Sequence, residues 1–103
     1  MTLHRLKTWP ESFADVVGRR KRYEIRVDDR AFAVGDALLL REWRKDPYVS
    51  GGTYTGEACL VTVVHKTAGG NWGLPENLCV LGIQLEEVPY AAMRAIIESE
   101  GGS

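Results

Sequence analysis

The sequence predicts an α+β domain: a small mixed β-barrel with one early helix and a C-terminal helix. Three observations support this class. Five or six segments have the alternating or continuously apolar pattern of strands, one early segment has helical spacing, and Gly- and Pro-containing stretches separate the strands. The 103 residues suffice for one compact domain. We place this domain at residues 1–98 and expect residues 99–103 to be a disordered tail.

The first elements are a short strand and a helix. Leu3 to Lys7 has the pattern of a strand, and Pro10 suits the first turn of a helix, where its missing N–H costs nothing. Three apolar residues then follow at the i, i+3, i+4 spacing of a buried stripe, namely Phe13, Val16 and Val17. Gly18 is well placed to end this helix.

Two more strands follow in the first half. Residues 22–27 alternate, so that one face carries Tyr23, Ile25 and Val27 and the other carries Arg22, Glu24 and Arg26. Turns at 28–30 and 34–36, with a short extended piece between them, lead to a strand over 37–44. If Leu38 and Leu40 face inward on that strand, Glu42 faces inward as well.

The second half alternates strands with loops. Residues 45–55, with Pro47 and two glycines, read as a loop, and residues 67–76 read as a second loop. Strands are expected over residues 56–66 and 77–85. Residues 89–98 have a helix-favouring composition, with one apolar side formed by Met93, Ile96 and Ile97.

Composition limits the class of protein. There is no stretch of about 18 apolar residues, so no membrane partner is expected. The N-terminus lacks the apolar run of a signal peptide, and we therefore expect a cytoplasmic protein. Cys59 and Cys79 lie in apolar runs without zinc spacing. We favour two reduced core thiols over a disulfide or a metal role, and expect no cofactor.

Charge is unevenly distributed along the chain. The net charge is −1, but residues 1–45 hold 11 Lys and Arg against 7 Asp and Glu, a net of +4. The remaining residues hold 2 against 7, a net of −5. A dipolar molecule of this kind can present a basic face to an anion, unless the two halves interleave and neutralise each other.

A group of charged residues occupies otherwise apolar elements. On one strand Arg22, Glu24 and Arg26 follow at two-residue spacing, which places them roughly 7 Å apart. We expect Lys7 and Glu42 to join this cluster from neighbouring strands. Buried charge is costly unless paired, so the cluster is either a structural ion-pair network or a ligand site. We favour the site.

Aromatic residues lie in two of the predicted loops. Trp72 stands in a glycine-rich loop and Tyr54 beside a glycine pair, where both could stack on bases or close the ends of the barrel. For Trp9 and Trp43, which lie on or beside regular elements, we favour a packing role. No nucleophile elbow, P-loop or dinucleotide fingerprint is present, and a metal site built from His4 and His65 is not expected.

The order of several short motifs resembles a known family. The motifs are His4-x-x-Lys7, Trp9-Pro10, Lys21-Arg22-Tyr23-Glu24-Ile25-Arg26, Val34-Gly35-Asp36, Arg41-Glu42-Trp43 and Tyr54-Thr55-Gly56. Together they resemble a family of uncharacterised bacterial and phage proteins that is similar to the ASCH domains of the PUA-like superfamily. The resemblance covers about residues 4–56, extends more loosely to Leu85, and leaves out the C-terminal helix.

The resemblance implies a small barrel that binds RNA in a cleft beside the first helix. One ASCH-like group of enzymes hydrolyses N4-acetylcytidine with a lysine, a threonine and a distal glutamate. Lys21 matches the lysine, but Glu24 stands in place of the threonine, and Glu76 matches the distal glutamate by position only.

Three functions follow from these observations. The first is a binding module for RNA or a nucleotide, with ligand-binding residues Lys7, Lys21, Glu24, Arg26, Arg30, Glu42, Tyr54 and Trp72. The second is an amidohydrolase acting on a modified nucleoside, with Lys21, Glu24 and Glu42 as catalytic residues. The third is a protein-interaction module that uses the C-terminal helix and an unknown protein partner. We favour the first.

Overall fold

The computed structural model of the chain describes residues 1–99. Its elements in chain order are β1 (Leu3–Thr8), α1 (Pro10–Val17), β2 (Tyr23–Val27), β3 (Ala37–Asp46), β4 (Val49–Thr67), β5 (Leu78–Glu86) and α2 (Tyr90–Glu98). Of the tail predicted at 99–103, residues 100–103 lie outside the described part. Ser99 is described and caps α2, its N–H donating to the Ile96 carbonyl.

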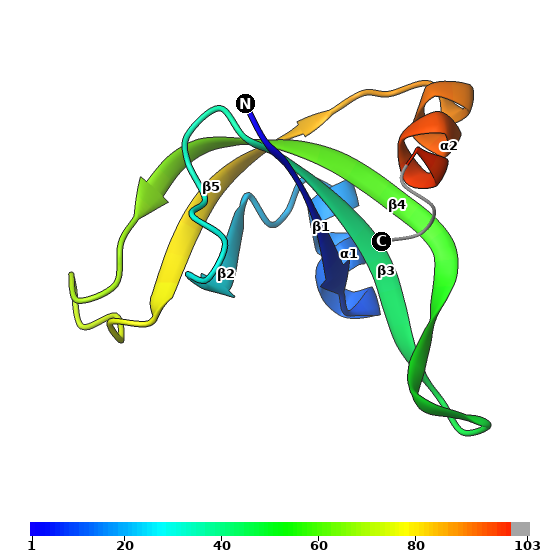
Figure 1. Cartoon of the computed structure of the whole chain (residues 1–103), viewed down its shortest axis with the longest axis horizontal. Coiled ribbons are helices and arrows are strands. Elements are labelled where there is room, and N and C mark those ends of the chain that lie inside the picture. The colour runs from blue at the N-terminus through cyan, green and yellow to red at the C-terminus, as the bar shows by residue number, and fades with distance from the viewer. Residues whose placement is uncertain (100–103) are drawn as a thin grey trace.

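The strands form one mixed sheet in the order β1-β3-β4-β5-β2. β1 runs parallel to β3, and the other neighbours are antiparallel. The sheet bends into an arch that brings its two edge strands, β1 and β2, toward each other (Figure 1). Along residues 1–99 no backbone ladder joins β1 to β2, so the sheet is open. The α+β class and the two helices are confirmed, whereas the open sheet does not show the expected barrel.

The concave side of the arch holds the core and α1 (Figure 1). Phe13 and Val16 of α1 are buried against the sheet, but Val17, which the spacing placed in the same stripe, is 47% exposed. The main contributors from the sheet are Leu6, Leu38, Leu40, Val61, Val63, Leu81 and Ile83. Cys59 and Cys79 lie in this core as free thiols. Burial, with a smaller contribution from the Glu24 charge, raises the pKa of the Cys59 thiol to about 12.

α2 packs on the outside of the sheet beside β4 (Figure 1). Its predicted apolar side is half-buried, consisting of Met93, Ile96 and Ile97. Arg5 of β1 holds the end of the helix, because its guanidinium donates to the Ile96 carbonyl at 3.0 Å and to Ser99 Oγ at 2.9 Å. Within the described chain, neither helix is long and apolar enough to cross a membrane.

The loop predicted at residues 45–55 is instead the tip of a β-ribbon. β3 extends to Asp46 and β4 begins at Val49, so that only Pro47 and Tyr48 turn the chain. Asp46 fixes this turn, because its side chain accepts a hydrogen bond from the Tyr48 N–H at 2.8 Å. Gly51 and Gly52 lie within β4 with φ of +85° and +132°. The two glycines that suggested a loop therefore allow an irregular backbone conformation within a strand.

Candidate functional site: a charged cleft at the open edge of the sheet

β2 turns its charged face inward and its apolar face outward. Tyr23, Ile25 and Val27 are each about half exposed, whereas Glu24 is 3% exposed. β2 is an edge strand that pairs only with β5 on one side, and its inner face looks across the open gap toward β1. A carboxylate is therefore buried at the one place where the sheet is not closed.

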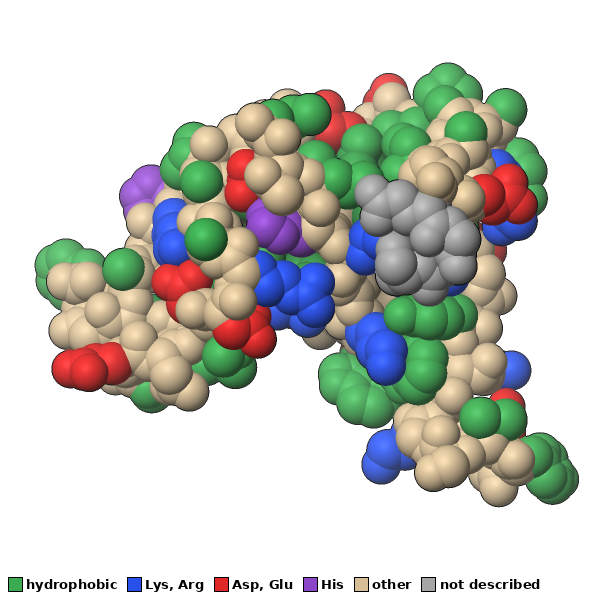
Figure 2. Space-filling model, in the orientation of Figure 1, with side chains coloured by type: hydrophobic (Ala, Val, Ile, Leu, Met, Phe, Trp, Pro, Cys, Tyr) green, Lys and Arg blue, Asp and Glu red, His purple; other side chains and the backbone are tan. Residues whose placement is uncertain are grey.

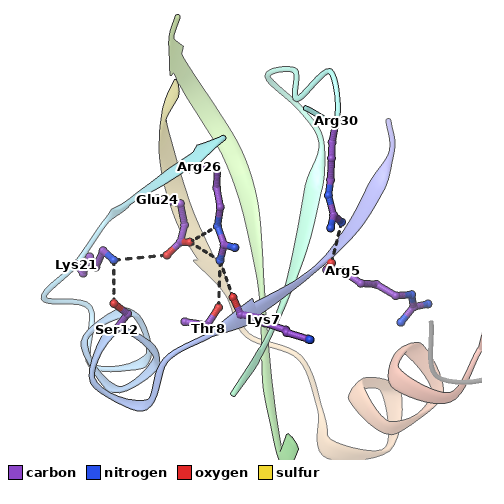
Figure 3. A network of polar contacts seen from close by, with 8 residues as sticks. All are labelled: Arg5, Lys7, Thr8, Ser12, Lys21, Glu24, Arg26 and Arg30. Atoms are coloured by element: carbon purple, nitrogen blue, oxygen red, sulfur yellow. Dashed lines mark hydrogen bonds and ion pairs between the residues drawn. The ribbon is translucent and has the colours of Figure 1, made fainter. Parts of the chain in front are cut away.

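Two basic side chains flank Glu24 (Figure 3). Arg26 Nε donates to Glu24 Oε2 at 3.0 Å, and Arg26 Nη2 lies 2.9 Å from the same oxygen. Lys21 Nζ lies 3.7 Å from Glu24 Oε1 and donates to Ser12 Oγ of α1 at 3.2 Å. Both cationic side chains keep some solvent contact, at 24% and 20% exposure. The buried charge is thus paired, as its burial requires.

One oxygen of Glu24 has no hydrogen-bond partner. Oε1 is buried and accepts no hydrogen bond from any described residue, since the Lys21 ammonium stands beyond hydrogen-bonding distance. Buried polar atoms without a partner are rare and call for an explanation, such as a missing ligand or solvent. An open cleft of about 250 Å³ adjoins this group and is lined by Lys7, Thr8, Trp9, Ser12, Lys21, Glu24, Ile25 and Arg26. We name it the charged cleft.

Arginine side chains span the gap between the two edge strands. Arg26 Nη2 donates to the Lys7 carbonyl at 2.9 Å and to Thr8 Oγ1 at 3.4 Å (Figure 3). Arg30, just beyond β2, donates to the Arg5 carbonyl at 2.9 Å. Side-chain bridges therefore span the gap where the described strands form no backbone ladder.

Only some of the predicted site residues lie together at the charged cleft. Lys21, Glu24 and Arg26 come together as expected. Lys7 joins them through its carbonyl, but its ammonium points away and lies 4.0 Å from the centre of the Trp43 ring. Arg30 belongs to the neighbouring gap. The sequence predicted Arg30 as a ligand-binding residue but did not indicate that its side chain would bind the backbone of β1.

The other three predicted residues lie outside the charged cleft. Glu42 is half-buried on β3 and accepts a hydrogen bond from Thr55 Oγ1 at 2.8 Å. Tyr54 packs edge-to-face on Trp43 with ring centres 4.7 Å apart. Trp72 is 95% exposed in the 68–77 loop, beside a separate shallow cavity that it shares with Leu74 and Val80. Neither Glu42 nor Trp72 contributes to the lining of the charged cleft.

Four residues that line the cleft were missed by sequence reasoning, and one of them, Ile25, was placed on the opposite face of its strand. Ser12 and Thr8 carry hydroxyl groups that meet Lys21 and Arg26, but nothing in their local sequence marks them. Trp9 was assigned to packing, yet it is 54% exposed and lines the cleft. Its position directly before Pro10 was the available signal, because a residue before a helix-starting proline stands outside the helix. Among residues 1–99, no three His, Cys, Asp or Glu side chains group as metal ligands do.

A comparison with protein families assigns the chain to one of them. No curated protein matches the chain. A model of the family described as a domain of unknown function, DUF3850, matches residues 3–83. This range includes β1, α1 and every residue that lines the charged cleft, whereas α2 lies beyond it. The chain therefore belongs to the DUF3850 family, a domain of unknown function.

Proposed function

We propose that the chain is an ASCH/PUA-like binding module that holds RNA or a nucleotide at the charged cleft. The observation that carries the proposal is the buried Glu24, whose Oε1 accepts no hydrogen bond from the described residues. A carboxylate oxygen of this kind suits the exocyclic amino group of a base. Arg26 and Lys21 stand on either side of it and suit a phosphate group.

Binding and mutation together test this proposal. The purified chain is titrated with the four ribonucleoside monophosphates and with short single-stranded RNAs by calorimetry. We expect Lys21→Gln and Glu24→Gln to weaken binding of any ligand found by about 10-fold or more, since each removes a charge-assisted contact. Arg20→Gln is the matched control, because Arg20 is an exposed neighbour paired with Asp15. No binding by the wild type, or equal losses in Lys21→Gln and Arg20→Gln, would contradict the proposal.

A second candidate function is hydrolysis of an acylated nucleoside such as N4-acetylcytidine. The observation that favours it is the Lys21 ammonium, which contacts both Ser12 Oγ and the Glu24 carboxylate at the cleft. Water would add to the acetyl carbonyl, and the C–N bond would break to give acetate and cytidine, with Lys21 and Glu24 moving the protons. This chain differs from the ASCH-like hydrolases of N4-acetylcytidine in that Glu24 stands where they have a threonine. Chromatography of N4-acetylcytidine incubated with the wild type and with Lys21→Ala tests it, and absence of cytidine would exclude it.

A further inference from the structure

Two more cavities adjoin the charged cleft. The first, of about 140 Å³, shares Lys7, Thr8 and Trp9 with the cleft and has Trp43 as its additional wall. We name it the aromatic slot. The second, of about 600 Å³, follows the free edge of β1 and shares Lys7 and Arg26 with the cleft. We name it the edge groove. Lys7 lines all three cavities, so they lie next to one another around this residue, and we name the three together the track.

The edge groove has the charge of a phosphate-binding surface. Four cationic residues line it, namely Arg5, Lys7, Arg26 and Arg30, and among residues 1–99 no carboxylate does. The Arg5 guanidinium is itself engaged by the end of α2. Figure 2 shows Lys and Arg side chains across the middle of this face, beside hydrophobic side chains. Arg30 donates one N–H to the Arg5 carbonyl, and a guanidinium carries five N–H donors. Further donors are therefore available to a phosphate without breaking this bond.

The aromatic slot has a rigid wall. The Trp43 ring is held edge-to-face by Tyr54, and its indole N–H donates to the Gly51 carbonyl at 3.3 Å. Tyr54 is held in turn by the Arg41 guanidinium, which stacks 3.8 Å from the ring centre. Lys7 Nζ lies over the face of the Trp43 ring, 4.0 Å from its centre, so a base that stacks on this face takes the place of the ammonium. Proteins that bind single-stranded nucleic acids combine an aromatic ring, on which a base stacks, with nearby cationic side chains.

The track is also longer than one nucleotide needs. β1 has six residues, so its free edge extends over about 17 Å at roughly 3.3 Å per step. The charged cleft lies near the end of β1 that precedes α1, and the edge groove continues to Leu3 at the other end. A free nucleotide in the charged cleft would leave most of the edge groove and the aromatic slot empty.

We infer that the ligand is a single-stranded nucleic acid of at least two nucleotides, with one base in the charged cleft, a neighbouring base against Trp43 in the aromatic slot, and the phosphates along the edge groove. This inference rests on the proposed function and makes it more specific. It assigns a binding role to Trp43 and gives Lys7 a phosphate contact through the ammonium that the stacked base displaces from the ring.

The test compares ligand length in wild-type protein and in variants of the slot. The probes are the four ribonucleoside monophosphates and single-stranded RNA and DNA tetranucleotides, with affinity measured by calorimetry at two salt concentrations. We expect the tetranucleotides to bind at least about 10-fold more tightly than the monophosphates, with stronger salt dependence. Trp43→Leu is expected to weaken tetranucleotide binding by roughly 5- to 100-fold and to leave monophosphate binding unchanged.

Two further variants complete the design. Lys7→Gln, at an exposed residue, is expected to reduce the salt dependence of tetranucleotide binding, and it serves as the test if Trp43→Leu lowers the melting temperature strongly. Trp72→Ala is the matched control, because its cavity shares no residue with the track.

The outcomes separate the inference from the proposed function. Equal affinity for monophosphates and tetranucleotides, or tetranucleotide binding that neither Trp43→Leu nor Lys7→Gln changes, would overturn the inference and leave the nucleotide-binding proposal standing. Absence of binding by any nucleotide or oligonucleotide would overturn both. A difference between RNA and DNA tetranucleotides would identify whether the 2′-hydroxyl is recognised.

Discussion

Glu24 and Asp36 are both buried carboxylates, yet their surroundings give them different roles. Asp36 is saturated: it accepts hydrogen bonds from the His4 ring at 2.9 Å, from the Thr2 N–H at 3.1 Å and from the Ala33 N–H at 3.0 Å. Glu24 keeps Oε1 without a hydrogen bond from any residue in the range 1–99. A saturated carboxylate stabilises the fold, whereas one with an open acceptor has capacity for a ligand.

Asp36 gives a pH-dependent prediction. Its pKa lies below the usual 3.8, first because the His4 side chain hydrogen-bonds the carboxylate, and despite burial, which acts in the opposite direction. Because the folded pKa is below the unfolded one, the stabilisation is present above about pH 4 and is lost as the pH falls through the folded pKa. Asp36→Asn should therefore lose less stability than the wild type between about pH 5 and pH 2.5, as urea unfolding would measure. Equal losses in the two proteins would contradict this role of Asp36.

At the scale of elements, the ribbon formed by β3 and β4 depends on one glycine. A Cβ atom at Gly52 would come within 2.5 Å of the Arg44 carbonyl oxygen and 2.6 Å of Trp43 Nε1. Gly52 also has φ of +132°, a conformation that other residues rarely adopt. The absence of a side chain at Gly52 therefore allows the Trp43 ring to pack against the backbone of the ribbon.

Gly52→Ala should displace Trp43 and destabilise the chain by about 1–3 kcal/mol, because strain and a steric clash act together. Gly51→Ala is the matched control: it has φ of +85°, but its Cβ would meet no atom within 4 Å. Urea unfolding and near-ultraviolet circular dichroism of the tryptophans measure both effects. If the two variants lose equal stability and keep the same aromatic spectrum, Gly52 does not position the ring.

Sequence patterns predicted the elements better than their edges and faces. Five strands and both helices were predicted near their observed positions, because apolar periodicity reflects burial against a single core. The loop predicted over residues 45–55 was wrong because a glycine pair such as Gly51-Gly52 occurs both in loops and in irregular strands, and the sequence does not distinguish the two. Glu24 and Arg26 were predicted as site residues because charge on an apolar strand is unusual, whereas Lys21 was predicted from the resemblance. The bridges to Thr8 and Ser12 were not predicted, because they join segments that only the fold brings together.

At the scale of the whole molecule, β1 connects the candidate site to the C-terminal helix. The carbonyl groups of Arg5 and Lys7 accept the bridges from Arg30 and Arg26, while the Arg5 side chain reaches the end of α2 on the outer face. α2 contains no fully buried residue, so contacts of this kind contribute a large share of its attachment.

Arg5→Gln should loosen α2 without unfolding the sheet. The variant loses the hydrogen bonds to Ile96 and Ser99, which we expect to cost about 1 kcal/mol, and the amides of α2 should exchange with solvent faster than in the wild type. Arg94→Gln is the control, because it removes only a surface pair with Glu98 within the helix. Unchanged exchange in α2 for Arg5→Gln would show that the helix is held by its apolar side alone.

The arginine bridges also bear on how the chain behaves among its own copies. A sheet with two free edges offers unpaired N–H and C=O groups to any passing strand, and exposed edges are common starting points for aggregation. Here the carbonyl groups of Arg5 and Lys7 on the free edge of β1 are occupied by Arg30 and Arg26, and the bulky guanidinium groups stand where an incoming strand would have to lie. The same two arginines that line the edge groove thus stand in the way of strand pairing at the free edge of β1.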